Sequence, residues 1–421
     1  MRPQTLLPVL LGGAVGFGGI LQGLRWKNAA AEAGNADLQE RIAELESSIE
    51  LLERENESLR SLAQGGGELK VPEPLIEFVE SAIGLDFRSS PVVHKIAGEE
   101  LRDRVTASIE SRFPPNSLSH RQQAWVRMGL LMPDDNFAGQ LAATYSIGAR
   151  SWFDDQTGEG WVTDRFQEGS VPDQAALIRA LVRILLHQHY PPPPGYPGDE
   201  PDRARNALHH GSAIAIENRF LARQALGIGF TGTQDDQSGA RDLLESLPAF
   251  VRGLATFPSQ LGPPRAGRLM DQEELLGALH SPPQTTMWFA EEGEGIETVK
   301  VAVPELPGED VLDESAGWLG LLLWLQTLDP ELSDLANAWR GDHYRLTAVS
   351  DTRLNLVWEI ALATPEDAEK IAGAACVMAG VLADAESDPA VGEAVDTPDG
   401  QRVLVERPAP DRVRFSNLAA E

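Results

Sequence analysis

The sequence predicts an α-rich α+β fold that follows an N-terminal apolar helix and a short coiled coil. Helical periodicity dominates from Val71 onward, with apolar residues recurring every three or four positions. Two stretches with aromatic or β-branched residues around a turn predict β-hairpins instead. We expect three parts: residues 1–27 as a membrane anchor or signal segment, residues 28–70 as a coiled-coil stalk with a glycine hinge, and residues 71–421 as one folded domain.

The composition is that of a large, folded and strongly acidic protein. Of its 421 residues, 42% are hydrophobic, and the formal net charge is -29. This charge repels phosphate backbones, so we expect no nucleic-acid partner. The single cysteine, Cys376, excludes an intramolecular disulfide and a cysteine-based zinc site.

The first segment is an uncharged run that is long enough to span a bilayer. It extends from Pro3 to Leu24 and has basic residues at both ends. This pattern predicts a single-pass anchor in the cell membrane, with the large domain outside the cytoplasm. A cleaved signal peptide is the alternative, because the alanines after Asn28 could form a cleavage site, and the protein would then be secreted or periplasmic.

Residues 36–62 carry a heptad repeat. The a positions are Ile42, Ile49 and Asn56, and the d positions are Leu38, Leu45, Leu52 and Leu59. Isoleucine at a with leucine at d favours a parallel two-stranded coil, and a buried asparagine fixes its register. We therefore expect a parallel homodimer through this segment. A single amphipathic helix lying on the domain is the alternative.

Further elements are expected in order along the domain. They are a helix over residues 99–113, a hairpin over residues 152–162, helices over residues 172–189 and 202–226, and paired strands over residues 402–405 and 412–415. Ser170 is a candidate cap for the second helix, because Pro172 suits a first helical position. The four prolines after Tyr190 stop that helix.

The order of hairpin, helix, loop and helix resembles a group of prokaryotic zincin-like metallopeptidases. In that group the first helix reads H-E-x-x-H-A-L-Q-D-Q-H-F and the second reads D-A-x-x-A-x-x-A-L-x-E-G-D-A. The matching segments here are residues 179–190 and 202–213. Further landmarks follow in the family's order: Phe257-Pro258, Pro282-Pro283, Trp339 to Asp342, and Val357-Trp358. The resemblance, which runs from about Val92 to Ala374, implies a zincin-like metallopeptidase domain.

The residues at the family's zinc site are replaced in this chain. The motif H-E-x-x-H places two histidines on one helical face to bind zinc, and its glutamate activates the bound water. Here the motif reads Arg179-Ala180-Leu181-Val182-Arg183, and the third ligand, an acid in the family, is His210. Arginine has no lone pair to offer a cation, and alanine cannot accept a proton.

These departures predict a pseudoenzyme: a membrane-tethered, non-catalytic metallopeptidase homologue that needs no cofactor and acts as a binding or scaffold module for an unknown protein or peptide. Arg179, Arg183 and His210 could form a basic ligand pocket. Alternatively, the two arginines pair with internal acids such as Glu217 or Asp173, because buried charge needs a partner.

Two other functions remain open from the sequence. One is a metal-dependent hydrolase with a relocated active site that uses His187, His189 and His210 as ligands. Against it, His187 and His189 lie two residues apart on a helix, so their side chains diverge. The other is an architectural envelope protein in which the former cleft has no role.

The heptad pattern makes a testable prediction about assembly. We expect residues 28–421 to form a dimer and residues 71–421 to be largely monomeric, because only the longer chain contains the repeat. Light scattering on the two purified chains measures the mass per particle. Equal masses for both would mean that the repeat does not set the assembly.

Overall fold

The computed structural model describes residues 67–227, 238–350 and 353–419. The predicted membrane segment and coiled coil lie outside these residues. Within them, no helix is both long enough and apolar enough to cross a membrane. The chain from Glu68 onward forms one folded unit that mixes helices and strands, which confirms the predicted α+β class at that level.

A small sheet contains the first hairpin. Its strands are β1 (Val93–Ile96), β2 (Ser151–Asp154) and β3 (Glu159–Thr163), in the order β1-β3-β2. β2 and β3 are antiparallel, with Trp152 opposite Trp161, which confirms the predicted hairpin. β1 joins the other side of β3 in parallel, so β2 is left at an edge of the sheet.

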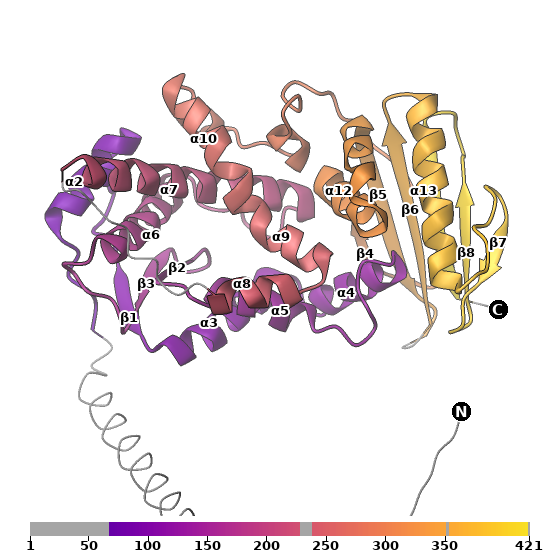
Figure 1. Ribbon diagram of the computed structural model, residues 1–421, viewed down its shortest axis with the longest axis horizontal. Helices are drawn as coiled ribbons and strands as arrows, with labels where there is room; N and C mark the ends of the chain where they lie inside the picture. Colours follow the sequence, from indigo (N-terminus) through magenta and orange to yellow (C-terminus); the bar gives the residue numbers. More distant parts are fainter. Residues whose placement is uncertain (1–66, 228–237, 351–352, 420–421) are drawn as a thin grey trace, which may run out of the picture. The chain divides into compact units, whose positions relative to one another are not determined.

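A larger antiparallel sheet is formed by the C-terminal part of the chain (Figure 1). In spatial order its strands are β4 (Glu309–Glu314), β5 (Trp339–Ala348), β6 (Leu354–Leu362), β9 (Arg412–Ala419), β8 (Gln401–Glu406) and β7 (Ala394–Asp396). The pairing of β8 with β9 confirms the predicted C-terminal hairpin. β6 is buried along its whole length. It lies between β5 and β9 in the sheet, and α13 (Pro365–Ala383) contacts it, while α12 (Gly317–Leu328) packs on β5. Arg414 of β9 also pairs with Glu359 of β6.

Helices make up the rest of the unit. In chain order they are α2 (Glu73–Ile83), α3 (Gly98–Arg112), α4 (Ser117–Arg127), α5 (Phe137–Ser146), α6 (Val171–His189), α7 (Asp199–Gly227), α8 (Ser238–Ser246), α9 (Ala249–Gln260), α10 (Gly262–Asp271) and α11 (Leu275–His280), with short 3-10 helices η1 (Thr286–Phe289) and η2 (Pro330–Ala338). The predicted helices over residues 99–113, 172–189 and 202–226 correspond to α3, α6 and α7. The side chain of Ser170 caps α6 by accepting a hydrogen bond from the backbone N–H of Asp173.

The pair of helices α6 and α7 is central to the packing. They pack along each other, α2 and sheet strands β2 and β3 contact α6, and α9 and α10 contact α7. Where α7 meets α10, Gly211 lies so close to Gly262 that a Cβ at either position would overlap backbone atoms. This close approach fixes α7 against α10 and leaves its other face turned toward α6.

A buried carboxylate joins α12 to the larger sheet. Asp342 of β5 accepts hydrogen bonds from the backbone N–H groups of Ala316 (2.8 Å) and Gly317 (2.9 Å) at the start of α12. Its oxygens also accept from the indole N–H groups of Trp339 (3.0 Å) and Trp358 (2.8 Å). The side chain therefore satisfies donors of a helix N-terminus and of two core tryptophans at once.

We expect Asp342→Ala to lower the free energy of unfolding by about 3 kcal/mol or more, because several buried donors lose their acceptor. The control is Asp313→Ala on β4, whose half-exposed carboxylate pairs with His343 and Arg345, and which should change stability by less than about 1 kcal/mol. Urea unfolding of both variants measures the difference. Similar small losses for the two would contradict the role given to Asp342.

Candidate functional site

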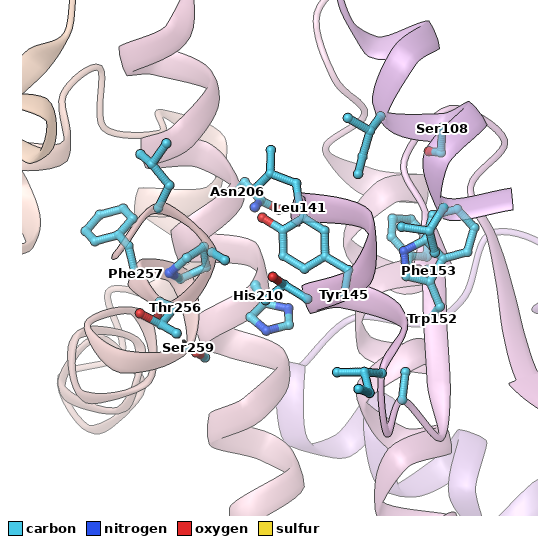
Figure 2. Close-up of a pocket in the computed structure, with 18 of the residues that line it drawn as sticks. Ser108, Leu141, Tyr145, Trp152, Phe153, Asn206, His210, Thr256, Phe257 and Ser259 are labelled. Atoms are coloured by element: carbon cyan, nitrogen blue, oxygen red, sulfur yellow. Dashed lines mark hydrogen bonds between the residues drawn. The ribbon is translucent and has the colours of Figure 1, made fainter. Parts of the chain in front are cut away.

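A cleft of about 1770 Å³ lies among the helices and the small sheet. Residues of α3, α5, β2, α6, α7, α8 and α9 line it, and Figure 2 shows side chains from several of these elements converging on it. Its walls are partly aromatic, with Tyr145, Trp152, Phe153 and Phe257 among them. The volume exceeds what a drug-sized ligand needs, so the cleft can hold a segment of a chain molecule.

The structure brings the candidate site residues named from the sequence together in this cleft. Arg179, Ala180 and Arg183 lie on one face of α6, because residues three and four apart on a helix are neighbours. His210 comes from α7, which packs along α6, and lines the same cleft. The predicted pocket of Arg179, Arg183 and His210 therefore exists as a spatial group.

Arg179 is held by Glu217 of α7. Its Nε and Nη2 atoms donate to the two carboxylate oxygens at 2.5 and 2.7 Å, a bidentate arrangement. The Glu217 side chain is buried, while the Arg179 side chain is 39% exposed to the cleft. The structure therefore shows internal pairing, which is one of the two alternatives for Arg179. Its partner, Glu217, is one of the two acids suggested by the sequence.

Arg183 is held by different partners from those expected. Its Nη2 donates to both oxygens of Asp155, at 3.1 and 3.2 Å, and its Nη1 donates to Oδ1 of Asn206 at 3.0 Å. Asp173, the other acid suggested by the sequence, pairs with Arg150 instead. Arg183 thus ties α6 both to the turn after β2 and to α7.

The charge of Asp155 is stabilised by these contacts. Burial by itself would raise the pKa of its carboxyl group, but the nearby charges of Arg183 and Arg112 outweigh it and hold the pKa well below its usual range. Asp155 therefore stays ionised, and the pair with Arg183 persists at any pH near neutrality.

His210 is neutral in this setting. Burial, followed by the positive charges of Arg183 and Arg179, lowers the pKa of its imidazole to about 3. Among the described residues, no group forms a hydrogen bond with its ring. His210 therefore offers the cleft one ring donor and one ring acceptor, without charge.

The structure does not bring His187, His189 and His210 together as a ligand set. Nε2 of His187 contacts the backbone carbonyl of Asp155 at 3.1 Å, and Nε2 of His189 contacts that of Asp86 at 2.8 Å. The described residues contain no group of three or more His, Cys, Asp or Glu side chains that could hold a metal ion. The two histidines of α6 act instead as tethers to neighbouring loops.

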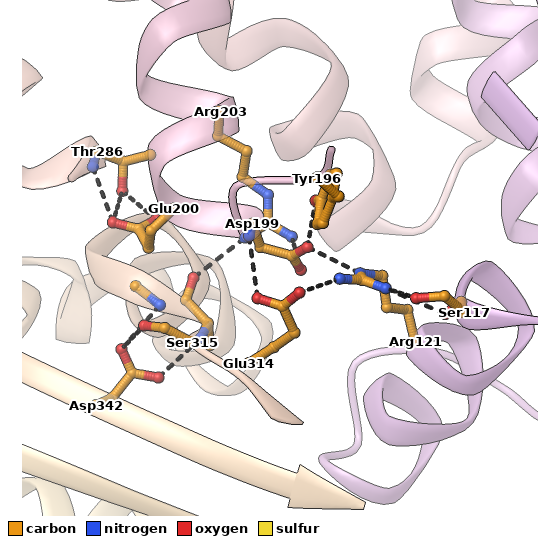
Figure 3. Close-up of polar contacts among 12 residues, drawn as sticks. Ser117, Arg121, Tyr196, Asp199, Glu200, Arg203, Thr286, Glu314, Ser315 and Asp342 are labelled. Atoms are coloured by element: carbon orange, nitrogen blue, oxygen red, sulfur yellow. Dashed lines mark hydrogen bonds and ion pairs between the residues drawn. The ribbon is translucent and has the colours of Figure 1, made fainter. Parts of the chain in front are cut away.

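One end of the cleft rests on a buried ion-pair network (Figure 3). Asp199, at the start of α7, accepts from Nε of Arg121 at 2.8 Å and from Arg203 at 2.9 Å. Arg121 also pairs with Glu314 of β4, and Tyr196 donates its hydroxyl to Asp199. Burial and the nearby charge of Asp199 raise the pKa of Glu314 to about 7. This network fixes the start of α7 relative to α4 and to the larger sheet.

Sequence reasoning missed several residues of the cleft. Asp155 lies in the turn of the predicted hairpin, where an aspartate is expected for turn geometry and gives no sign of its arginine partner. Asn206 lies four residues before His210, so helical spacing could have placed it on the same face. Tyr145 of α5 carries no such signal.

Comparisons of the chain with models of protein families, with curated proteins and with solved structures found no match. The resemblance to zincin-like metallopeptidases therefore rests on the motif order alone and stays a prediction.

The lowered pKa of His210 makes a prediction about acid stability. The unfolded chain takes up a proton at this residue below about pH 6.5, whereas the folded chain does so only near its lowered value of about 3. Stability contributed by the neutral ring is therefore lost as the pH falls from about 6.5 toward about 3. We expect His210→Gln to lose less stability than the native chain between about pH 7 and about pH 5. Urea unfolding at both pH values measures this, and equal losses would contradict the assigned burial.

Proposed function

We propose that this protein is a non-catalytic relative of the zincin-like metallopeptidases that binds a polypeptide segment in the cleft beside α6 and α7. The observation that carries the proposal is the pair of guanidinium groups at the positions of the two family histidines, each bound to an acid. A guanidinium has no lone pair to offer a metal ion, and the acid beside each one is already engaged in the ion pair.

The ion pairs resist rearrangement toward a metal site. Releasing Asp155 to act as a metal ligand would leave the buried guanidinium of Arg183 without its acid, which costs about 3–5 kcal/mol. Ala180 supplies no base at the position where the family has glutamate. The residues that remain favour binding over hydrolysis.

Several features of the cleft support a polypeptide as the ligand. β2 is an edge strand of the small sheet and lines the cleft with Ser151, Trp152 and Phe153. An extended peptide can add to such an edge through its backbone, while its side chains contact the aromatic walls. The size of the cleft also suits a segment of several residues.

The N-terminal residues complete the proposal. The apolar run before residue 25 and the heptads of residues 36–62 support a membrane-tethered parallel dimer. Two clefts carried on one stalk would bind a ligand with two matching segments more tightly than one cleft alone.

Zinc binding tests the proposal directly. We expect the native chain to hold no stoichiometric zinc, and we expect the quadruple variant Arg179→His, Ala180→Glu, Arg183→His, His210→Glu to gain zinc more readily than peptidase activity. Metal binding requires mainly correct ligand geometry, whereas turnover also requires tuned surroundings. Elemental analysis after dialysis against zinc measures binding, and a casein assay measures activity.

The matched control retains Ala180 and carries the other three changes, so it should bind zinc without any hydrolysis. Circular dichroism establishes that each variant is folded. About one zinc per native chain, lost in His210→Ala, would overturn the non-catalytic function. A folded quadruple variant that binds no zinc would show that the two helices are wrongly matched to the family motif.

A further inference from the structure

The charged side chains that α6 and α7 direct into the cleft are all paired within the described part of the chain. The pairs are Arg112–Asp202 (2.6 Å), Arg179–Glu217 (2.5 Å), Arg183–Asp155 (3.1 Å) and Arg203–Asp199 (2.9 Å). In each pair the carboxylate is largely buried, with at most 15% of the side chain exposed. A ligand carboxylate that reached one of these guanidinium groups would share it with a buried acid, so two like charges would lie close together in the cleft and repel each other.

A positively charged ligand meets the same difficulty. A ligand ammonium group would have to compete with a guanidinium that already donates directly to the buried acid. The rim differs, because Asp242 of α8 is exposed, and water screens its charge there. The interior of the cleft between α6 and α7 therefore presents no uncompensated charge of either sign.

The polar groups left for a ligand are neutral. Oδ1 of Asn206 accepts from Arg183, which orients the amide and leaves its NH₂ group as a donor toward the cleft. His210 is a neutral imidazole with both ring nitrogens open. The hydroxyl of Tyr145 has no hydrogen-bond partner among the described residues, and a phenol is protonated at neutral pH.

These neutral groups face one region of the cleft. Asn206 and His210 are four residues apart on α7 and so lie on the same helical face. Figure 2 shows the ring of Tyr145, from α5, reaching toward them across the cleft, with Trp152 and Phe153 of β2 on another wall. The region combines neutral hydrogen-bonding groups with aromatic surface.

We propose that the cleft selects polypeptide segments without charged side chains where they contact α6 and α7, and that Tyr145, Asn206 and His210 recognise backbone amides or neutral polar side chains of the segment. This proposal names the ligand chemistry of the proposed peptide-binding function and rests on that function. The pairing of charges on both walls causes this selection. A neutral segment satisfies the open donors and acceptors, whereas a charged segment adds a charge beside pairs that are already neutral.

The experiment is a selection of random heptapeptides displayed on phage by the immobilised full chain. Enriched peptides should be poor in Asp, Glu, Lys and Arg, and their affinity should fall about tenfold in Asn206→Ala, which removes a hydrogen-bond donor of the site.

In Glu217→Gln, Arg179 loses its acid, so the selected peptides should now contain Asp or Glu. A peptide with one Gln→Glu change should then bind this variant about tenfold more tightly than it binds the native chain.

The matched control is Asp271→Asn, which removes the acid partner of Arg219 on the same helix α7 but outside the cleft. This variant should select the same peptides as the native chain. If Glu217→Gln does not fold, Asp155→Asn frees Arg183 and should shift the selection in the same direction.

The outcomes separate this inference from the function on which it rests. Suppose that the peptides selected by the native chain bind in the cleft but carry a charged residue at a fixed position. This result would overturn the proposed preference for uncharged segments and leave the peptide-binding function intact. Selected peptides whose affinity does not change in Asn206→Ala, or no enrichment at all, would overturn both.

Discussion

The ion pairs between α6, α7 and the turn after β2 are the interaction on which the site depends. Arg183 reaches Asp155 in the turn and Asn206 on α7. Arg179 reaches Glu217, which lies about two turns beyond His210 on α7. The two guanidinium groups supply positive charge between the helices, and each is neutralised by an acid whose side chain is largely buried.

The remaining properties of the cleft follow from this pairing. Burial, together with the two nearby guanidinium groups, lowers the pKa of His210 and keeps its ring neutral. Arg183 also fixes the orientation of the Asn206 amide. A similar principle operates at the other end of the cleft, where Arg121 and Arg203 neutralise Asp199 and hold the start of α7. Buried charge in this fold is used to fix elements in place.

Local signals in the sequence were enough to predict the elements that position the site. The hairpin of β2 and β3 has aromatic flanks around an Asp/Gly turn, and α6 has a serine cap, an early proline and a proline stop. These features act over a few residues, so they are readable without the fold. Internal pairing was one of two alternatives for the arginines, and Glu217, one of the two acids suggested for it, is the partner of Arg179 in the structure.

Long-range features could not be read in the same way. β6 is buried along its whole length although it carries Asn355 and Glu359, and the larger sheet was recognised from the sequence only at β8 and β9. Asp155 and Arg183 are 28 residues apart, and only the packing of the turn against α6 makes them partners. Asp342 matched a family landmark in the sequence, but its role at the start of α12 depends on a helix and a strand that meet only in the folded chain.

A double-mutant cycle on Arg183 and Asp155 tests the central claim most directly. The variants are Arg183→Met, Asp155→Asn and the double change, and urea unfolding in the presence of a metal chelator measures each free energy. If the pair joins α6 to the turn as a buried ion pair, the coupling energy should lie between about 1 and 3 kcal/mol. Additive effects, with a coupling below about 0.5 kcal/mol, would contradict the claim that these guanidinium contacts hold the site together.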